Sequence, residues 1–223
     1  MRPRTRPLGI AALAAALMLV ACDGQRYDQA ICVLIDTSGT YAEEKPEVAR
    51  ILKSEVIPAM LPGDTLLVIR IDSASYEKSN VEALVTLDSR PSQANAQKLA
   101  LAQKLDAFAA EPGQSKYTDI LGAMMLGSDY LGEIPAASRV MLVFSDLEQD
   151  LSPGTQRTVR DHEFDGIQLV AMNVKRLNAD NADPAYFRDR LAGWQSRVTQ
   201  GGAVGWRAIM DAQQLPAHLA SLR

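Results

Sequence analysis

Short apolar runs alternate along this chain with segments long enough to form helices. The run Ala30–Ile35 is apolar throughout, and Arg139–Phe144 and Ile167–Val174 are nearly so. Such runs are typical of parallel strands that are buried on both faces of a sheet. The predicted strands are Ala30–Ile35, Thr65–Ile71, Asn80–Leu87, Arg139–Phe144, Ile167–Val174 and Gly205–Ile209. Their alternation with helices predicts an α/β fold, a doubly wound six-stranded sheet with helices on both faces.

The segments between the runs carry helical patterns. In Glu43–Met60, for example, the apolar residues recur near a spacing of 3.6, and prolines mark its end. The predicted helices are Glu43–Met60, Ser92–Ala110, Thr118–Leu131, a short Gly154–His162, Pro184–Val198 and Leu215–Leu222. The connection Asp72–Ser79 is too short for a helical crossover, so the second and third strands should pair antiparallel. The sheet should therefore be mostly parallel, with one short antiparallel edge strand.

The first residues have the pattern of an export signal. Three arginines precede an uncharged apolar run of residues 8–21, which is too short to span a membrane because a spanning helix needs about 20 residues. The run ends in Leu19-Val20-Ala21-Cys22, which resembles the bacterial lipoprotein signal, cleaved before a cysteine that is then acylated. Asp23 resembles an inner-membrane retention signal. A plain signal peptide with a chance cysteine is the alternative.

These features divide the chain into three parts. Residues 1–21 are the expected signal peptide, 22–29 a lipidated tether at Cys22, and 30–223 the folded domain. The expected location is the extracytoplasmic face of a bacterial membrane, held there by the lipid, with the inner membrane favoured. Several acyl chains together anchor a protein stably, whereas one binds only marginally.

Charge and composition exclude several classes of partner and site. The net charge is −4 and aromatic residues are 5% of the chain, so neither a basic surface nor a set of stacking rings for nucleic acid is expected. Two histidines, His162 and His218, leave little room for a zinc site. With Cys22 modified, Cys32 would be the remaining thiol, and its apolar surroundings indicate a buried structural cysteine.

Oxygen-bearing side chains follow the predicted strands at one edge of the sheet. Asp36 ends the first strand, Ser38 and Thr40 follow it at two-residue steps, Thr118 opens a helix, and Asp146 follows the fourth strand. The first and fourth strands should lie side by side where the strand order reverses, so these side chains should converge. An oxygen-only set suits Mg²⁺. Taken singly, Ser38 and Thr118 could instead be caps or turn residues.

The run Ile31–Thr40 resembles the opening of a von Willebrand factor type A domain. In that family a D-x-S-x-S loop, a distant threonine and a distant aspartate form a metal-ion-dependent adhesion site. The resemblance covers about residues 29–223 and implies that Asp36, Ser38, Thr40, Thr118 and Asp146 bind Mg²⁺, or a similar ion such as Mn²⁺ or Ca²⁺. It further implies that an acidic residue of a protein partner completes the coordination, and that the domain is not an enzyme.

Two departures from the family pattern stand out. Thr40 replaces the usual serine, which keeps the oxygen and adds a methyl group. Leu147 follows Asp146 where the family often has glycine, which should stiffen or displace that loop. Two alternatives remain: a type A domain that has lost its metal and serves as a structural subunit, and a phosphatase of the haloacid dehalogenase type. The latter rests on Asp36-Thr37-Ser38-Gly39-Thr40, which resembles that family's D-x-x-G-T loop.

The remaining acids near this edge are expected to be solvated. Asp119, Glu148 and Asp150 are predicted to lie in water around the rim. Asp36 itself is expected on the rim rather than in the core, so that Asp36→Ala would leave the fold largely intact.

Overall fold

The computed structural model describes residues 27–39, 41–113 and 115–223. The signal peptide, Cys22, Asp23, most of the tether and Thr40 lie outside the described residues, so the predictions for them stay predictions.

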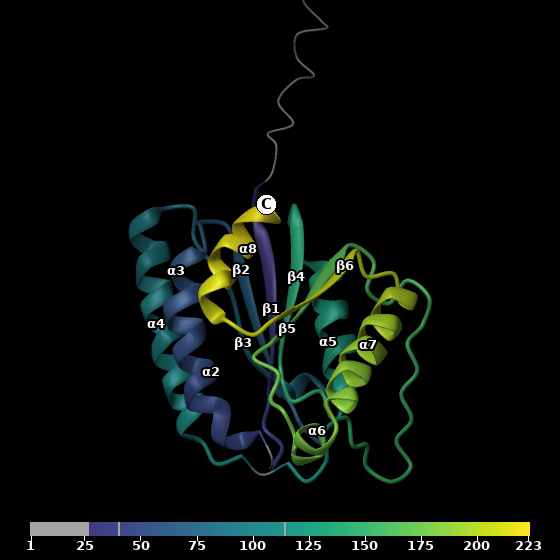
Figure 1. The fold of residues 1–223 in the computed structure, drawn as a ribbon. Helices are drawn as coiled ribbons and strands as arrows, with labels where there is room; N and C mark the ends of the chain where they lie inside the picture. The colour runs from purple at the N-terminus through teal and green to yellow at the C-terminus, as the bar shows by residue number, and fades with distance from the viewer. Residues whose placement is uncertain (1–26, 40, 114) are drawn as a thin grey trace, which may run out of the picture.

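One six-stranded sheet organises the described chain (Figure 1). Its order is β3-β2-β1-β4-β5-β6, and every pair is parallel except β2 with β3, which is antiparallel. The bounds are β1 Gln29–Asp36, β2 Thr65–Ile71, β3 Val81–Thr86, β4 Ser138–Phe144, β5 Ile167–Met172 and β6 Gly205–Ile209. The predicted strands, the antiparallel edge strand and the neighbouring β1 and β4 are all confirmed.

Helices cover both faces of the sheet. The predicted helix Glu43–Met60 is a continuous helical segment made of η2 Ala42–Glu44, α2 Lys45–Ile51, the π-helical η3 Leu52–Val56 and α3 Ile57–Ala59. The others are η4 Lys78–Asn80, α4 Pro91–Ala110, α5 Ile120–Glu133, α6 Asn178–Ala182, α7 Pro184–Gln200, η5 Ala212–Gln214 and α8 Leu215–Ser221. Helices α2, α3, α4 and α8 lie on one face, and α5 and α7 on the other (Figure 1).

The predicted helix Gly154–His162 is wrong. Residues 145–166 contain no helix or strand of their own and run from β4 to β5 as an irregular segment. Gly154 has a φ of 85°, and the segment lacks an apolar stripe that could face the sheet. Phe164 anchors it instead, fully buried among the residues of α5 and α7. The short α6 was not predicted, because five residues carry too little periodicity to be recognised.

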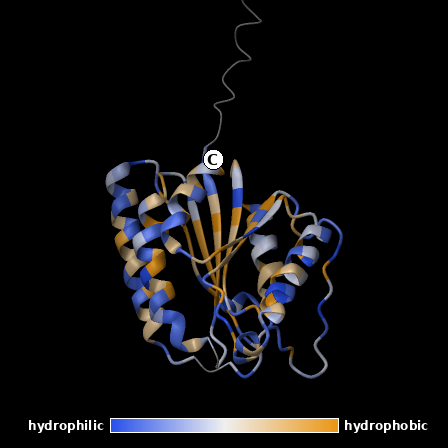
Figure 2. Ribbon diagram, viewed as in Figure 1, coloured by the Kyte–Doolittle hydropathy of each residue, from blue (hydrophilic) through white to orange (hydrophobic). Residues whose placement is uncertain are grey.

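Each face of the sheet has its own apolar layer. Alternate side chains of β1 pack on opposite sides, with Ile31 and Val33 against α2 and α4, and Cys32 against α5. Helix α5 lies very close to β1 at Gly127, where an added Cβ would come within 2.8 Å of the Cys32 Sγ. Cys32 is fully buried, as expected, and burial raises the pKa of its thiol. Figure 2 shows the hydrophobic strands between helices whose outer faces are hydrophilic.

Both ends of the described chain lie at the amino edge of the sheet. Arg223 donates hydrogen bonds to the Tyr27 carbonyl (3.1 Å) and to the buried Asp64 carboxylate. The carboxyl ends of β1 and β4 lie at the opposite edge (Figure 1). Among the described residues, no helix has the length and hydropathy needed to cross a membrane.

Candidate functional site

Asp36 ends β1 at the carboxyl edge and is fully buried. Its Oδ1 accepts the Ser38 N–H (2.8 Å) and its Oδ2 accepts the Ser145 hydroxyl (2.6 Å). Both donors are neutral. Burial raises the pKa of Asp36, these hydrogen bonds lower it, and the negative charge of Asp146 raises it further. The two strands that carry these carboxylates are neighbours, as predicted, but Asp36 is buried and does not lie on the rim as the sequence indicated.

The loop after β4 holds Asp146 in a constrained backbone. The Asp146 Oδ1 accepts the Glu148 N–H (2.9 Å), and the Ser145 Oγ accepts the Leu147 N–H (3.0 Å). Leu147 has a φ of 63°, a left-handed conformation that favours glycine. Its side chain is buried, and its carbonyl accepts the Trp194 indole N–H (2.9 Å). The leucine therefore keeps the backbone conformation that glycine would take more easily, and it adds core packing.

Thr118 lies just before α5 rather than inside it. Its backbone forms an isolated antiparallel bridge with Asp150, and its side chain is buried. Asp119 caps α5 by accepting the Gly122 N–H (2.9 Å), and it pairs with Arg157 at 2.7 Å. The expectation that Asp119 is solvated is therefore wrong, because the residue is fully buried and Arg157 and the first turn of α5 take the place of water around its carboxylate. Glu148 and Asp150 are exposed, as predicted.

Ser38 is buried in the turn after β1. Besides donating its N–H to Asp36, it forms an isolated bridge with Ser115, three residues before Thr118. The backbone bridges of Ser38 with Ser115 and of Thr118 with Asp150 connect the three loops that carry the predicted ligands. Thr40 lies outside the described residues. The assignment of these residues as metal ligands stays a prediction.

Tyr41 is a neighbour that the sequence did not indicate. It is fully buried, and its hydroxyl has no hydrogen-bond partner among the described residues. Burial raises the pKa of this phenol, and the charges of Glu44, Asp36 and Asp146 raise it further. Its place directly after the Asp36–Thr40 motif was the available signal.

The donor set fits a hard divalent ion. In the part of the chain that the structure describes, no three His, Cys, Asp or Glu residues form a cluster that could hold a metal. The candidate set has two carboxylates, with hydroxyls for the rest, and oxygen ligands with several waters are what Mg²⁺ prefers. A soft thiolate or imidazole site of the zinc type is not what these residues would build.

Comparison with known proteins identifies the fold. No family model matches the chain, and neither does any curated protein sequence. Among solved structures, the PilB minor pilin of Streptococcus sanguinis aligns with 89% of this chain and 61% of its own at 9% identity, with a TM-score of 0.55. BatB of Bacteroides thetaiotaomicron aligns with 87% of this chain and 96% of its own at 10% identity, with a TM-score of 0.51.

At TM-scores just above 0.5, these matches show a likeness of fold, and the sheet of this chain has the order and the antiparallel edge strand given above. The chain has a von Willebrand factor type A-like fold. A von Willebrand factor type A protein from Catenulispora acidiphila also aligns, with 87% of this chain and 41% of its own at 12% identity and a TM-score of 0.48. The type A-like domain described here spans about three fifths of the minor pilin. At these identities the likeness concerns the fold alone.

Proposed function

We propose that this type A-like domain is a membrane-anchored, extracytoplasmic binding module. It holds a divalent ion through Asp36, Ser38, Thr40, Thr118 and Asp146, and the ion binds an acidic residue of a protein partner. One observation carries the proposal. Among the described residues, four aspartates are fully buried, and Asp36 is the one that no arginine neutralises.

A buried carboxylate stays ionised only when something compensates its charge. Asp64 has Arg223, Asp119 has Arg157 and Asp180 has Arg190. Asp36 instead has two neutral donors and the nearby negative charge of Asp146. A divalent cation beside both carboxylates would supply the missing positive charge.

The same features favour binding over catalysis. A shell of hydroxyls and water would leave most of the ion's charge unneutralised, so a partner's carboxylate would remain an attractive ligand. A phosphatase of the haloacid dehalogenase type would need Asp36 as an accessible nucleophile. Asp36 is fully buried, and a hydrogen bond occupies each of its oxygens. These facts argue against the phosphatase alternative.

The proposed anchor and the proposed site lie at opposite ends of β1. The described chain enters at the amino edge, and Asp36 lies eight residues along at the carboxyl edge. At about 3.3 Å per residue the strand is on the order of 25 Å long. A lipid at Cys22 would therefore leave the metal site facing away from the bilayer, toward a partner.

Metal titration tests the site. Isothermal titration of the full chain with Mn²⁺, in competition with Mg²⁺, should show one site that Asp36→Asn abolishes. Asp72→Asn is the matched control, because Asp72 follows the neighbouring β2 at the same edge but is outside the ligand set. Partner capture from membranes should then disappear both with EDTA and with Asp36→Asn. Capture that persists unchanged in both conditions would favour a structural domain without metal.

Acyl labelling tests the anchor. A clickable fatty acid should label the wild-type protein, and Cys22→Ser should abolish the label and alter processing of the leader. The matched control is Cys32→Ser, which keeps the leader intact. Labelling that survives Cys22→Ser would contradict the anchor.

A further inference from the structure

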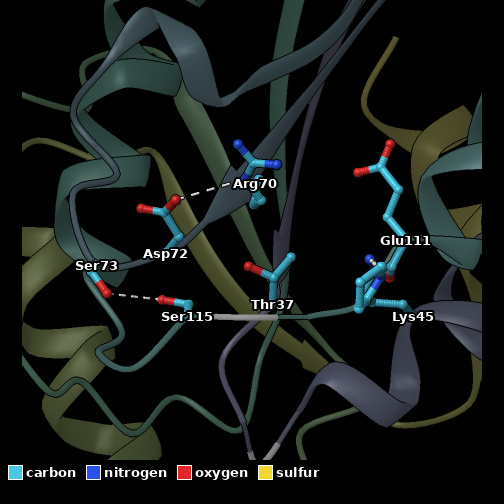
Figure 3. A pocket seen from close by; sticks show the side chains of 8 residues that line it. Thr37, Lys45, Arg70, Asp72, Ser73, Glu111 and Ser115 are labelled. Carbon is cyan, nitrogen blue, oxygen red and sulfur yellow. Dashed lines mark hydrogen bonds and ion pairs between the residues drawn. The ribbon is translucent and has the colours of Figure 1, made fainter.

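A cavity of about 440 Å³ opens beside the β1 turn, on the side away from Asp146. Lys45 and Glu111 lie on one side of it, and Asp72, Ser73 and Ser115 on the opposite side, with Arg70 and Thr37 between them (Figure 3). Thr37 donates its hydroxyl to the Ile71 carbonyl (2.8 Å), toward β2. The cavity and the candidate metal site therefore share the turn Asp36–Ser38 as a common wall.

Lys45 is a buried cation that pairs with no carboxylate among the described residues. Its side chain is 3% exposed, and it is the buried lysine of the described chain. Its Nζ donates to the Glu111 carbonyl (2.7 Å) and lies 4.4 Å from the centre of the Phe108 ring. An ammonium has three donors, so two remain for a ligand. Burial lowers the pKa of Lys45 and the negative charge of Glu111 raises it, and the loss of water has the larger effect.

Arg70 supplies a second cationic group to the same cavity. Its Nη1 pairs with Glu82 (3.0 Å), and its Nε lies 3.7 Å from the Asp72 carboxylate, beyond hydrogen-bond distance. The Nε has no hydrogen-bond partner among the described residues, but it is buried and out of reach of a ligand in the cavity. The side chain as a whole is 30% exposed, so Arg70 attracts an anion through its positive charge.

We propose that this cavity is an anion subsite that binds one carboxylate group, an aspartate or glutamate side chain of the protein partner, through Lys45 and Arg70. The inference is carried by the Lys45 ammonium, which has donors to spare, and by the Arg70 guanidinium in the same cavity. Its role in partner binding rests on the proposed function, whereas the subsite itself does not require the metal.

The surrounding charges select the class of anion. Glu82 and Asp72 already offset the charge of Arg70, and Glu111 lies exposed near Lys45. One singly charged carboxylate would neutralise Lys45. A doubly charged phosphate would add negative charge beside Asp72 and Glu111, and like charges at such distances repel. A partner segment with two acidic residues could thus place one on the ion and the other in this cavity.

The subsite is tested by measuring how tightly the full chain binds N-acetylglutamate amide in EDTA. The NMR shifts of the Thr37 and Ser115 amides report the binding. Lys45→Met should weaken binding by about tenfold or more, the factor for a charge-assisted hydrogen bond. Lys98→Met is the matched control, because Lys98 also donates to a backbone carbonyl, that of Met60 (2.6 Å), away from the cavity, and it should bind as the wild type does.

Glu111→Gln provides an independent variant at an exposed position. It removes a competing negative charge, so it should bind the blocked glutamate more tightly than the wild type does. Weaker or equal binding would contradict the proposal, as would an unchanged affinity in Lys45→Met or no shift at Thr37 and Ser115.

Two further measurements distinguish a failure of the proposed subsite from a failure of the proposed metal site. Inorganic phosphate that shifts the same amides at lower concentration than the blocked glutamate would overturn the choice of carboxylate. Glutamate binding that needs Mg²⁺ and vanishes in Asp36→Asn would place the acid on the metal and overturn the subsite. If the blocked glutamate binds in EDTA but Mn²⁺ never binds, the subsite stands and the proposed function fails.

Discussion

The two edges of the sheet each bury an aspartate, and they treat its charge differently. At the amino edge, Asp64 accepts the backbone N–H groups of Gln29 (2.8 Å) and Leu61 (2.7 Å) and pairs with Arg223 through both oxygens. At the carboxyl edge, Asp36 has neutral donors alone and Asp146 nearby. A carboxylate neutralised by its own chain holds the fold together, whereas one left without a cation is available for an ion from outside.

The largest expected effect is at the amino edge. Arg223→Ala would leave the buried Asp64 charge without compensation, and breaking a buried pair in this way costs about 3–5 kcal/mol. Urea unfolding in EDTA should show that loss in the free energy of unfolding. The control is Arg50→Ala, which removes the exposed pair with Glu47 and should leave the free energy of unfolding almost unchanged. If the two variants lose the same free energy of unfolding, Arg223 does not stabilise the amino edge as proposed.

The second prediction concerns the carboxyl edge. Mn²⁺ at one hundred times its dissociation constant should stabilise the wild type by about 2.7 kcal/mol and leave Asp36→Asn unaffected. In EDTA the Asp36→Asn protein should be no less stable than the wild type, since it loses an uncompensated charge. Thermal unfolding with and without Mn²⁺ measures both effects. A large loss of stability in EDTA would mean that Asp36 is structural, like Asp64.

A smaller effect is expected at Leu147, where the carboxyl edge combines strain with packing. Burying the leucine side chain stabilises the fold by about 1.5–3 kcal/mol. Holding a residue with a Cβ in the left-handed conformation costs about 1–2 kcal/mol, and glycine would avoid that cost. Leu147→Gly should therefore destabilise by about 1 kcal/mol, the difference between those terms. Leu147→Ala keeps the strain and loses the packing, so it should be less stable than Leu147→Gly. The reverse order in chemical denaturation would show that the backbone there is unstrained.

The smallest effect is a difference in pH dependence. Without metal, burial raises the pKa of Asp36 in the folded state. The native protein is therefore stabilised as pH falls through that raised value, and the full penalty of the buried charge is present only above it. The hydrogen bond from Arg190 lowers the pKa of Asp180, so its contribution is present above the unfolded pKa and is lost as pH falls through the folded one. In EDTA, the stability of Asp36→Asn relative to wild type should rise with pH, and that of Asp180→Asn should fall. Melting temperatures measured from acidic to neutral pH give the slope for each variant. Slopes of the same sign would contradict the opposite pKa shifts of Asp36 and Asp180.

The sequence predicted the elements whose periodicity is strong and missed those that depend on single contacts. The strands and the long helices repeat over many residues, so each was predicted to within a few positions. The segment 145–166 was predicted partly as a helix because its polar pattern is ambiguous. Contacts such as Arg157 with Asp119, 38 residues apart, fix it in an irregular form.

The candidate site shows the same division. The order of the motif placed Asp36 and Asp146 after neighbouring strands, and the structure confirms that β1 and β4 are neighbours. The burial of Asp36 and Asp119 was not predictable, because a residue at the end of a strand is exposed or buried according to how the adjoining loops pack over it.

The sequence by itself determined the alternation of strands and helices, the antiparallel edge strand and the edge at which the oxygen-bearing residues gather. Those properties follow from local periodicity and connection length, both of which can be read directly from the sequence. Tertiary structure alone decided which charges are compensated. Arg223 pairs with Asp64 across 159 positions, whereas Asp36 and Lys45 have no oppositely charged partner in the part of the chain that the structure describes. Charge pairing depends on distances set by packing in three dimensions, and sequence spacing does not record those distances.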